Sequence, residues 1–270
     1  MARIILIETS TALCSVALAE DGRIVAYKES ETPRAQASLT APFVKDLLDE
    51  RGLGVRDCDA VCVSKGPGSY TGLRVGVSTA KGLCFGAGIP LIAVGTLDTL
   101  VYQAADSSLL SVAPKDLPPG TSDSSVTFAS GFRYIVPMVD ARRMEVYTAV
   151  FTPDGRQLTD TRPQVIESLS QIIGDGIGTL SHSQPDSPEG ISFADLLAEG
   201  QVLFIGDGAS KCREVLAHPN AHFAQCCPKA SAMLHPAFAA WDARRFEDTA
   251  YFEPFYLKDF IATVPRKKLF

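Results

Sequence analysis

The most informative stretch of the chain reads Gly66-Pro-Gly-Ser-Tyr-Thr-Gly-Leu-Arg-Val-Gly-Val-Ser-Thr-Ala-Lys-Gly-Leu-Cys-Phe-Gly-Ala-Gly88. It follows a β-branched run at 60–64 that predicts a buried strand. Small residues then recur at every fourth position of the predicted helix, at Gly72, Gly76, Ala80 and Cys84. Because residues four apart share one helix face, and an interior glycine costs about 1 kcal/mol relative to alanine, we expect this face to pack closely against another helix, in this chain or in a partner.

The composition sets the broad class of protein. The chain has 270 residues, of which 46% are hydrophobic, enough for one large or two modest globular domains. Its formal net charge of −6 disfavours a free-standing nucleic-acid-binding protein, which would normally present a basic face. A subunit whose partner supplies the basic surface remains compatible with this charge.

The cysteines and the N-terminus predict the compartment. Seven cysteines, with no Cys-x-x-Cys motif, lie largely in apolar segments, where a free thiol behaves as a small hydrophobic group. Residues 1–8 enter a strand directly without a signal-peptide pattern, and no apolar run approaches the ~20 residues of a membrane span. We therefore expect a cytoplasmic protein that does not contact the membrane.

The first part of the chain predicts a mixed sheet covered by helices. Asp21-Gly22 is a strong two-residue hairpin signal between two apolar runs. The expected elements are strands at 3–8, 14–19, 23–28, 60–64 and 91–94, with helices at 36–51 and in the glycine-rich stretch. This β-β-β-α-β-α-β order combines an antiparallel meander with parallel crossovers.

The remainder of the chain predicts a second β-rich domain. A short helix at 97–103 is followed by a serine-, proline- and glycine-rich loop insertion at 106–131. Further strands are expected at 134–139, 145–151 and 202–205, and a last helix at 231–246. We place the boundary so that the domains comprise residues 1–104 and 105–270. The two halves could be one fold duplicated beyond sequence recognition.

Four blocks resemble a known family. They are Ile7-Glu8-Thr9-Ser10-Thr11, Gly66-Pro-Gly-Ser-Tyr-Thr-Gly-Leu-Arg-Val-Gly76, Val139-Asp-Ala-Arg-Arg-Met-Glu-Val-Tyr147 and Gly206-Asp-Gly-Ala209. Together they are similar to signatures of the TsaB (YeaZ) family of tRNA threonylcarbamoyladenosine biosynthesis. The resemblance implies an α/β fold of the actin, Hsp70 and sugar-kinase (ribonuclease H-like) superfamily, with two related β-β-β-α-β-α halves.

The resemblance also implies a function. TsaB-like chains are non-catalytic scaffold subunits for N6-threonylcarbamoylation of adenosine 37 in tRNAs that read ANN codons. They bind and activate the paralogue TsaD, which holds the metal and the nucleotide, and the ATPase TsaE joins the complex. Such chains form homodimers in isolation and meet tRNA only indirectly, through the complex. No catalytic residue, metal or cofactor beyond weakly bound ATP or ADP is then expected in this chain.

The resemblance places the partner and dimer interface on the helices of the first domain. The residues that we assign to it are Leu39, Phe43, Gly72, Arg74, Gly76, Thr79, Ala80, Leu83 and Cys84. Arg74 either meets a partner across the glycine face or is an ordinary solvated arginine. Replacing Gly76 by leucine is expected to weaken pairing while leaving the interdomain cleft intact.

A vestigial nucleotide site is expected at two turns. Its residues are Glu8, Thr9, Ser10, Thr11, Gly206, Asp207 and Gly208. Nucleotide-binding members of the superfamily use an acidic residue and hydroxyl groups here, although a strand end capped by local hydroxyl bonds explains the first turn equally. The glycines at 66–68 are interpreted as a tight turn, with Ser69 or Thr71 capping the helix.

Other chemistry is weaker in this sequence. His218 and His222 have the spacing of a metal-binding helix face, but Pro219-Asn220 lies between them. Gln36 stands where related chains often have a histidine. The alternatives to a scaffold are an ATP-dependent kinase-type enzyme and a metallopeptidase.

Two further segments of the chain are rich in charged residues. The residues Asp140, Arg142, Arg143 and Glu145 could line the interdomain cleft, face a partner or form internal ion pairs. The basic run at 266–268 is interpreted as a solubilising terminus rather than a tRNA contact.

Overall fold

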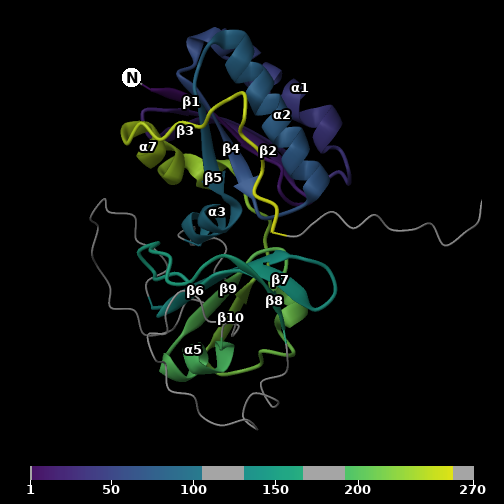
Figure 1. Ribbon diagram of the computed structural model, residues 1–270, viewed down its shortest axis with the longest axis vertical. Helices are drawn as coiled ribbons and strands as arrows, with labels where there is room; N and C mark the ends of the chain where they lie inside the picture. Colours follow the sequence, from purple (N-terminus) through teal and green to yellow (C-terminus); the bar gives the residue numbers. More distant parts are fainter. Residues whose placement is uncertain (1, 105–130, 167–191, 258–270) are drawn as a thin grey trace, which may run out of the picture.

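The computed structural model describes residues 2–104, 131–166 and 192–257. Two sheets lie one beyond the other along the longest axis of the molecule (Figure 1). The strands of the first sheet are β1 (Arg3–Glu8), β2 (Cys14–Glu20), β3 (Arg23–Ser30), β4 (Ala60–Gly66) and β5 (Leu91–Gly95). Their order is β3-β2-β1-β4-β5, with β1, β2 and β3 antiparallel and β4 and β5 parallel to β1. The mixed sheet expected from the sequence is confirmed.

The second sheet repeats this topology. Its strands are β6 (Tyr134–Asp140), β7 (Glu145–Thr148), β8 (Arg162–Val165), β9 (Val202–Ile205) and β10 (Ala221–Ala224). In the order β8-β7-β6-β9-β10, an antiparallel meander again flanks the first strand on one side and two parallel strands on the other. The two halves are therefore one fold used twice, although no repeat is visible in the sequence.

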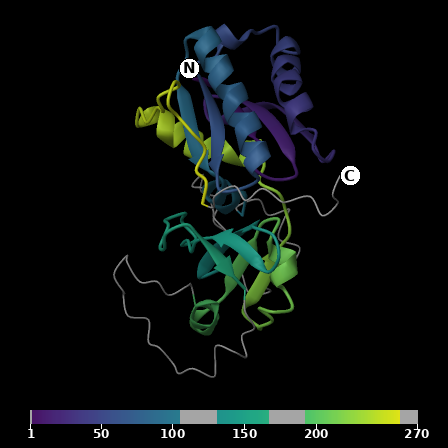
Figure 2. The ribbon, with the colours of Figure 1, turned by 45° about the vertical axis from the view of Figure 1, so that its right-hand side comes forward.

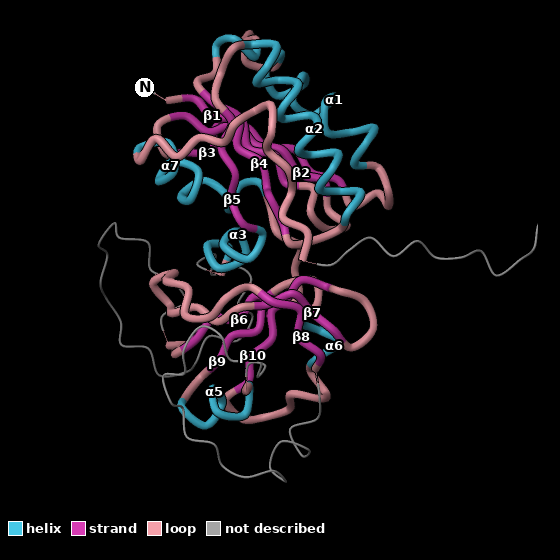
Figure 3. Tube along the Cα trace, viewed as in Figure 1, coloured by secondary structure: helices cyan, strands magenta, loops and turns pink. Residues whose placement is uncertain are grey.

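Helices cover both faces of the first sheet. One face is covered by α1 (Gln36–Asp49) and α2 (Tyr70–Ala87), joined through the short η1 (Val55–Asp57) and β4. The opposite face is covered by η3 (Ala230–Met233) and α7 (Leu234–Asp242) (Figure 3). Alternate side chains of a strand point to opposite faces, so burial on both faces explains the almost continuous apolar run in β1.

The domains meet through α3 (Thr96–Gln103). Apolar side chains of this helix pack with the second sheet, including Leu100 with Ile135 and Val139. The amide side chain of Gln103 then closes the joint: its Nε2 donates to the carbonyl of Cys227 at 2.9 Å, and its Oε1 accepts from the amide of Lys229 at 2.9 Å. The second domain carries only the short helices α5 (Phe193–Glu199) and α6 (Ala209–Cys212) among its described residues.

The end of the chain returns to the first domain. Residues 230–242 pack under the first sheet, although they follow the second sheet in sequence. The division at residue 104 does not account for this return. The segment 247–257, called here the strap, then runs along α2 (Figure 2). Lys81 of α2 donates to the strap carbonyls of Ala250 and Phe252 at 3.1 and 2.9 Å, respectively.

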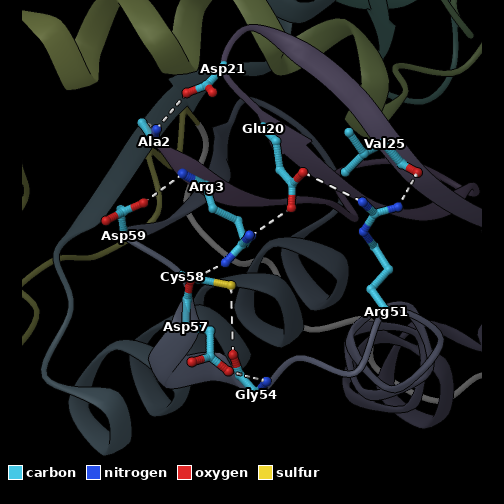
Figure 4. Close-up of polar contacts among 10 residues, drawn as sticks. All are labelled: Ala2, Arg3, Glu20, Asp21, Val25, Arg51, Gly54, Asp57, Cys58 and Asp59. Carbon is cyan, nitrogen blue, oxygen red and sulfur yellow. Dashed lines mark hydrogen bonds and ion pairs between the residues drawn. The ribbon is translucent and has the colours of Figure 1, made fainter.

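A polar network fixes the amino-terminal end of β1, opposite the end that carries the candidate site (Figure 4). Arg3 is its centre: Nε forms an ion pair with Glu20 at 2.7 Å, and Nη1 donates to the carbonyl of Asp57 at 2.6 Å. The backbone amide of Arg3 donates to the carboxylate of Asp59, also at 2.6 Å. These contacts tie β1 to β2 and to the segment that leads into β4.

Candidate functional site

Glu8 ends β1 inside the protein. Its side chain is fully buried, and Oε1 accepts hydrogen bonds from the backbone amide of Ser10 at 2.6 Å and from the hydroxyl of Ser64 at 2.9 Å. Burial raises the pKa of this carboxyl from 4.5 to about 7, while the hydrogen bonds from Ser10 and Ser64 oppose the rise. Oε2 has no hydrogen-bond partner among the described residues. Sequence reasoning missed Ser64, which comes from β4.

The turn at Thr9 and Ser10 rests directly on α2. A methyl group added at Gly72 would lie 2.1 Å from the carbonyl oxygen of Thr9, and one at Gly76 would lie 2.3 Å from Thr9 Oγ1. Thr9 Oγ1 donates to the carbonyl of Gly72 at 2.8 Å. The glycines of this helix face therefore allow the chain's own turn to approach. The expectation that they pack against another helix is replaced by this contact.

The Gly66-Pro-Gly68 turn secures the same site from the other side. The backbone amide of Ser69 donates to the carbonyl of Ser10 at 2.6 Å, and a methyl group at Gly68 would lie 2.4 Å from that oxygen. Of the two expected capping residues, Ser69 is the N-cap of α2, accepting from the amide of Gly72 at 3.4 Å. The glycine-rich signature thus holds the Glu8–Thr11 turn in place.

This arrangement limits what the turn can bind. The amide of Ser10, which a phosphate-binding turn would offer to a ligand, is already bonded to the carboxylate of Glu8. That carboxylate is also fully enclosed. The hydroxyl oxygens of Ser10 and Thr11 are buried and have no hydrogen-bond partner among the described residues. No group of three or more His, Cys, Asp or Glu residues in the described part of the chain is placed to hold a metal ion.

The second predicted turn, Gly206–Gly208, lies against the end of β6. Gly206 has a φ of 138°, and a methyl group there would lie 2.2 Å from the carbonyl oxygen of Met138. Asp207 Oδ1 accepts from the backbone amide of Asp140 at 2.9 Å. Burial raises the pKa of Asp207 to about 6; the hydrogen bond from the amide of Asp140 opposes this rise, while the charge of the Asp140 carboxylate adds to it.

A crossing segment, residues 225–230, separates the two turns. Gln225 Nε2 donates to the carbonyl of Asp207 at 2.9 Å, and the thiol of Cys227 lies beside Thr11. The amide of Ala230 donates to Ser15 Oγ of the first sheet at 2.9 Å. Within the described residues no hydrogen bond or ion pair joins the turns directly; Gln225 of the crossing segment bonds the second turn, and Cys227 lies beside the first.

The predicted interface residues divide into two sets. Gly72, Gly76, Ala80 and Cys84 are buried within the chain. Arg74 is exposed, and the half-buried remainder consists of Leu39, Phe43, Thr79 and Leu83. The guanidinium of Arg74 already has contacts within the chain. Its Nη1 donates to Tyr70 OH at 3.1 Å, and the group lies over the ring of Tyr70.

Sequence reasoning missed the most prominent residue of the outer face. Phe85 of α2 is 87% exposed. It lies between Gly82 and Gly86, at both of which an added methyl group would meet nothing within 4 Å. The signal was present: Phe85 follows Cys84 directly, so it is turned by about 100° from the small-residue row in a helix of 3.6 residues per turn. We call the exposed Arg74 and Phe85, together with the half-buried Leu39, Phe43 and Leu83 of the same helix pair, the outer face.

The remaining candidates have structural roles or lie elsewhere. His218 precedes β10 in a loop, and its Nδ1 accepts from the amide of Asn220 at 3.1 Å. His222 lies in β10 and contacts Gln201, so the two histidines do not share a helix face. The expected loop insertion at 106–131 falls almost wholly outside the described residues, and the basic run at 266–268 does so entirely. Among the described residues, no helix combines the length and apolar character needed to cross a bilayer.

Comparison with known proteins identifies relatives of the whole fold. Residues 30–113 match the family described as TsaD: tRNA N6-adenosine threonylcarbamoyltransferase. A YeaZ structure from Pseudomonas aeruginosa superposes with a TM-score of 0.69 at 24% identity, covering 95% of this chain and 100% of that one. This likeness confirms the expected two-domain α/β fold.

Two curated relatives carry the same name. The tRNA threonylcarbamoyladenosine biosynthesis protein TsaB of Escherichia coli is 31% identical over 211 residues, covering 74% of this chain and 80% of the relative. TsaB of Bacillus subtilis is 30% identical over 213 residues, covering 79% and 74%, respectively. By this identity over most of both chains, the protein belongs to the family of the tRNA threonylcarbamoyladenosine biosynthesis protein TsaB.

Proposed function

We propose that this chain is a non-catalytic subunit in tRNA threonylcarbamoyladenosine biosynthesis, and that it binds and activates a TsaD-type threonylcarbamoyltransferase through its outer face. The observation that carries the proposal is Phe85, which is 87% exposed on the helix pair of the first domain. Aromatic side chains and arginine are enriched in protein–protein interfaces, and Phe85 shares the exposed side of α2 with Arg74, about three turns away along the helix. Open glycines on either side of Phe85 leave room for a partner side chain.

The family match supports the choice of partner. The segment similar to TsaD, residues 30–113, contains both α1 and α2. If the paralogue carries the same pair of helices, the surface that joins two copies of this chain can also join one copy to TsaD. Exchange of a homodimer for a heterodimer through equivalent helices follows, because an isologous interface uses the same patch on each subunit.

The buried carboxylate supports the absence of catalysis in this chain. Glu8 occupies the amide of Ser10 that a bound phosphate would need, and its oxygens are not accessible to a metal ion from solvent. We infer that nucleotide chemistry resides in TsaD and that the ATPase TsaE acts on the assembled pair. The contribution of this chain is then to stabilise one conformation of its partner by differential binding.

The test is reconstitution of threonylcarbamoyladenosine formation on unmodified tRNA. The reaction contains TsaD, TsaE and the enzyme that makes the threonylcarbamoyl-adenylate donor, with this chain present or omitted. We expect modification to require the chain, to persist with Glu8→Gln and to fall at least tenfold with Phe85→Glu. Modification that proceeds without the chain would refute the scaffold role, and loss of activity with a folded Glu8→Gln protein would favour a nucleotide-dependent enzyme.

A matched variant separates the surface from general effects of added charge. Leu158 is 42% exposed in the second domain, remote in sequence from α1 and α2. Leu158→Glu is expected to support modification at the wild-type rate. Equal losses with Leu158→Glu and Phe85→Glu would mean that the outer face has no special role.

A further inference from the structure

The hairpin between β6 and β7 carries two arginines in an unusual backbone conformation. Arg142 has a φ of 69° and Arg143 a φ of 51°, both in the left-handed region that glycine and asparagine tolerate best. Both side chains are exposed. A turn of this kind forms more readily with Asn-Gly, so two consecutive arginines gain nothing for the backbone. Any advantage of arginine at these two positions therefore lies in its charged side chain.

The tip of this hairpin is rigidly held. The amide of Ala141 donates to the carbonyl of Glu145 at 3.1 Å, and the amide of Glu145 donates to the carbonyl of Arg142 at 3.2 Å. Asp140 Oδ1 accepts from the amide of Arg142 at 3.0 Å. Lys211 joins the hairpin to α6 through Asp140 and through the carbonyl of Glu145, the latter at 2.7 Å. The two arginines therefore project from a fixed support.

The charges at the tip are not neutralised within the described chain. Lys211 forms the ion pair with Asp140, one of the two acidic residues, with Glu145, that flank the tip. Neither Arg142 nor Arg143 forms an ion pair with any residue that the structure describes. Two adjacent guanidinium groups thus stand on a chain whose net charge is −6. Guanidinium groups bind phosphate in a two-pronged geometry and keep their charge at any physiological pH.

We propose that the Arg142–Arg143 tip binds backbone phosphates of the substrate RNA when the complex is assembled. This inference rests on the proposed function, which makes tRNA the available polyanion, and it departs from the expectation that such a chain meets tRNA only indirectly. An RNA backbone is favoured over an acidic protein because the tip presents two adjacent charges, and among the described residues the large exposed apolar side chains beside it are those of Met144 and Val165, 38% and 54% exposed. Protein interfaces surround charges with an apolar centre, whereas phosphate contacts need only positioned cations.

The experiment uses the complex of this chain with TsaD and measures binding of an unmodified tRNA transcript at several salt concentrations. The test variant is the double substitution Arg142→Asn and Arg143→Gly, which suits the left-handed backbone and removes both charges. We expect affinity for the transcript to fall roughly tenfold, and the slope of log K against log salt to decrease in magnitude by about 1.4, since each single-strand phosphate contact contributes about 0.7. The melting temperature of the variant should not fall.

Two further variants make the result specific. Arg244 is also exposed, with a φ of 54°, at the end of α7. Arg244→Gly removes one charge from a left-handed position elsewhere and should leave affinity and slope at the wild-type values. Replacing both Arg142 and Arg143 by lysine keeps the charges and should retain most of the salt slope.

The outcomes separate this proposal from the proposed function. Unchanged affinity and slope in the Asn-Gly variant would overturn the RNA contact while tRNA modification still depended on the wild-type chain. Loss of TsaD binding by that variant, with the protein folded, would mean that the tip contacts the partner protein and would also overturn the proposal. If modification never requires the wild-type chain, the proposed function fails first, and this is seen without any variant.

Discussion

The carboxylate of Glu8 accepts a hydrogen bond from the backbone amide of Ser10, 2.6 Å away and two residues further along the same turn. The turn is thereby closed on itself, with Ser64 as a second donor from the neighbouring strand. Because Glu8 already bonds this amide, the turn cannot offer it to a phosphate. The burial of Glu8 has consequences that can be measured.

The ionisation of Glu8 should make stability depend on pH. Because burial raises the pKa from 4.5 to about 7, the native state holds a proton that the unfolded chain has released over this range. Stability therefore falls as pH rises between these values and changes no further above them, by up to about 3 kcal/mol. Urea unfolding from pH 4 to 8 should show a larger fall in stability for the wild type than for Glu8→Gln, in which only other groups, such as Asp207 up to about pH 6, contribute. Parallel profiles for the two proteins would contradict it, and the exposed Glu253→Gln serves as the control.

The glycines of α2 should differ in their tolerance of alanine. Gly72→Ala places a methyl group on the carbonyl of Thr9 and should destabilise the protein by about 1–3 kcal/mol. Gly82→Ala meets open space in the same helix and should stabilise it by about 0.5–1 kcal/mol. Denaturant titration of both proteins decides the matter. Equal changes in the free energy of unfolding for the two variants would show that a methyl group at Gly72 is accommodated against Thr9 without cost.

The same geometry corrects the use of Gly76 as a probe of pairing. A side chain at Gly76 would meet Thr9 Oγ1 at 2.3 Å, so Gly76→Leu would disturb the site turn before it reached any partner. Phe85→Glu is the appropriate probe. If two copies pair through the outer face, this change should raise the homodimer dissociation constant at least tenfold, a loss of about 1.4 kcal/mol. Sedimentation analysis measures the constant, and a value equal to that of Leu158→Glu would remove Phe85 from the interface.

The strap should depend on Lys81. Its ammonium group donates to two strap carbonyls, and hydrogen bonds from charged groups contribute about 1.5–3 kcal/mol each. Lys81→Met should therefore accelerate limited proteolysis within residues 247–257 roughly tenfold or more, since local opening governs cleavage. Lys45→Met removes only an exposed ion pair of α1 and should leave the cleavage rate unchanged. An unaltered cleavage rate in Lys81→Met would mean that Phe252 and the other contacts of the strap are sufficient to hold it in place.

Local patterns predicted the elements of the first domain well. Apolar runs, the Asp21-Gly22 turn and the Gly88 helix end are short-range signals, and each has its expected counterpart: φ is 46° and 75° at the turn, and 73° at Gly88. The ends of the helices and strands were predicted less accurately. The last helix, expected at 231–246, is a 3-10 turn followed by Leu234–Asp242, and the strand expected at 145–151 keeps regular pairing only to Thr148. Backbone pairing at an element's end depends on neighbours that a local pattern does not contain.

The sequence indicated which residues form the two turns of the candidate site but not which contacts these residues make. The family signatures pointed to Glu8 and to the turn of Asp207, and both are buried carboxyl groups with raised pKa values. That Glu8 bonds the amide of Ser10 could not be foreseen, because a carboxylate at a strand end serves a ligand or its own turn with the same sequence. The row of small residues on α2 was correctly predicted to be a close-packing face. The segment that packs against it was predicted to be a helix, but it is the turn at Thr9.

Amino-acid order alone was sufficient for the element order of the first domain, for the family and for the periodic spacing of Gly72 and Gly76, but it did not predict β8 and β10 of the second sheet. Periodicity records that one face of a helix must be small, since only missing side chains permit close approach. It does not record which backbone approaches. Folding settled that choice by bringing Thr9, in the turn after β1, onto α2, while turning Phe85 outward and returning residues 230–257 to the first sheet. These are contacts between distant segments, and they are fixed by the shape of the whole core.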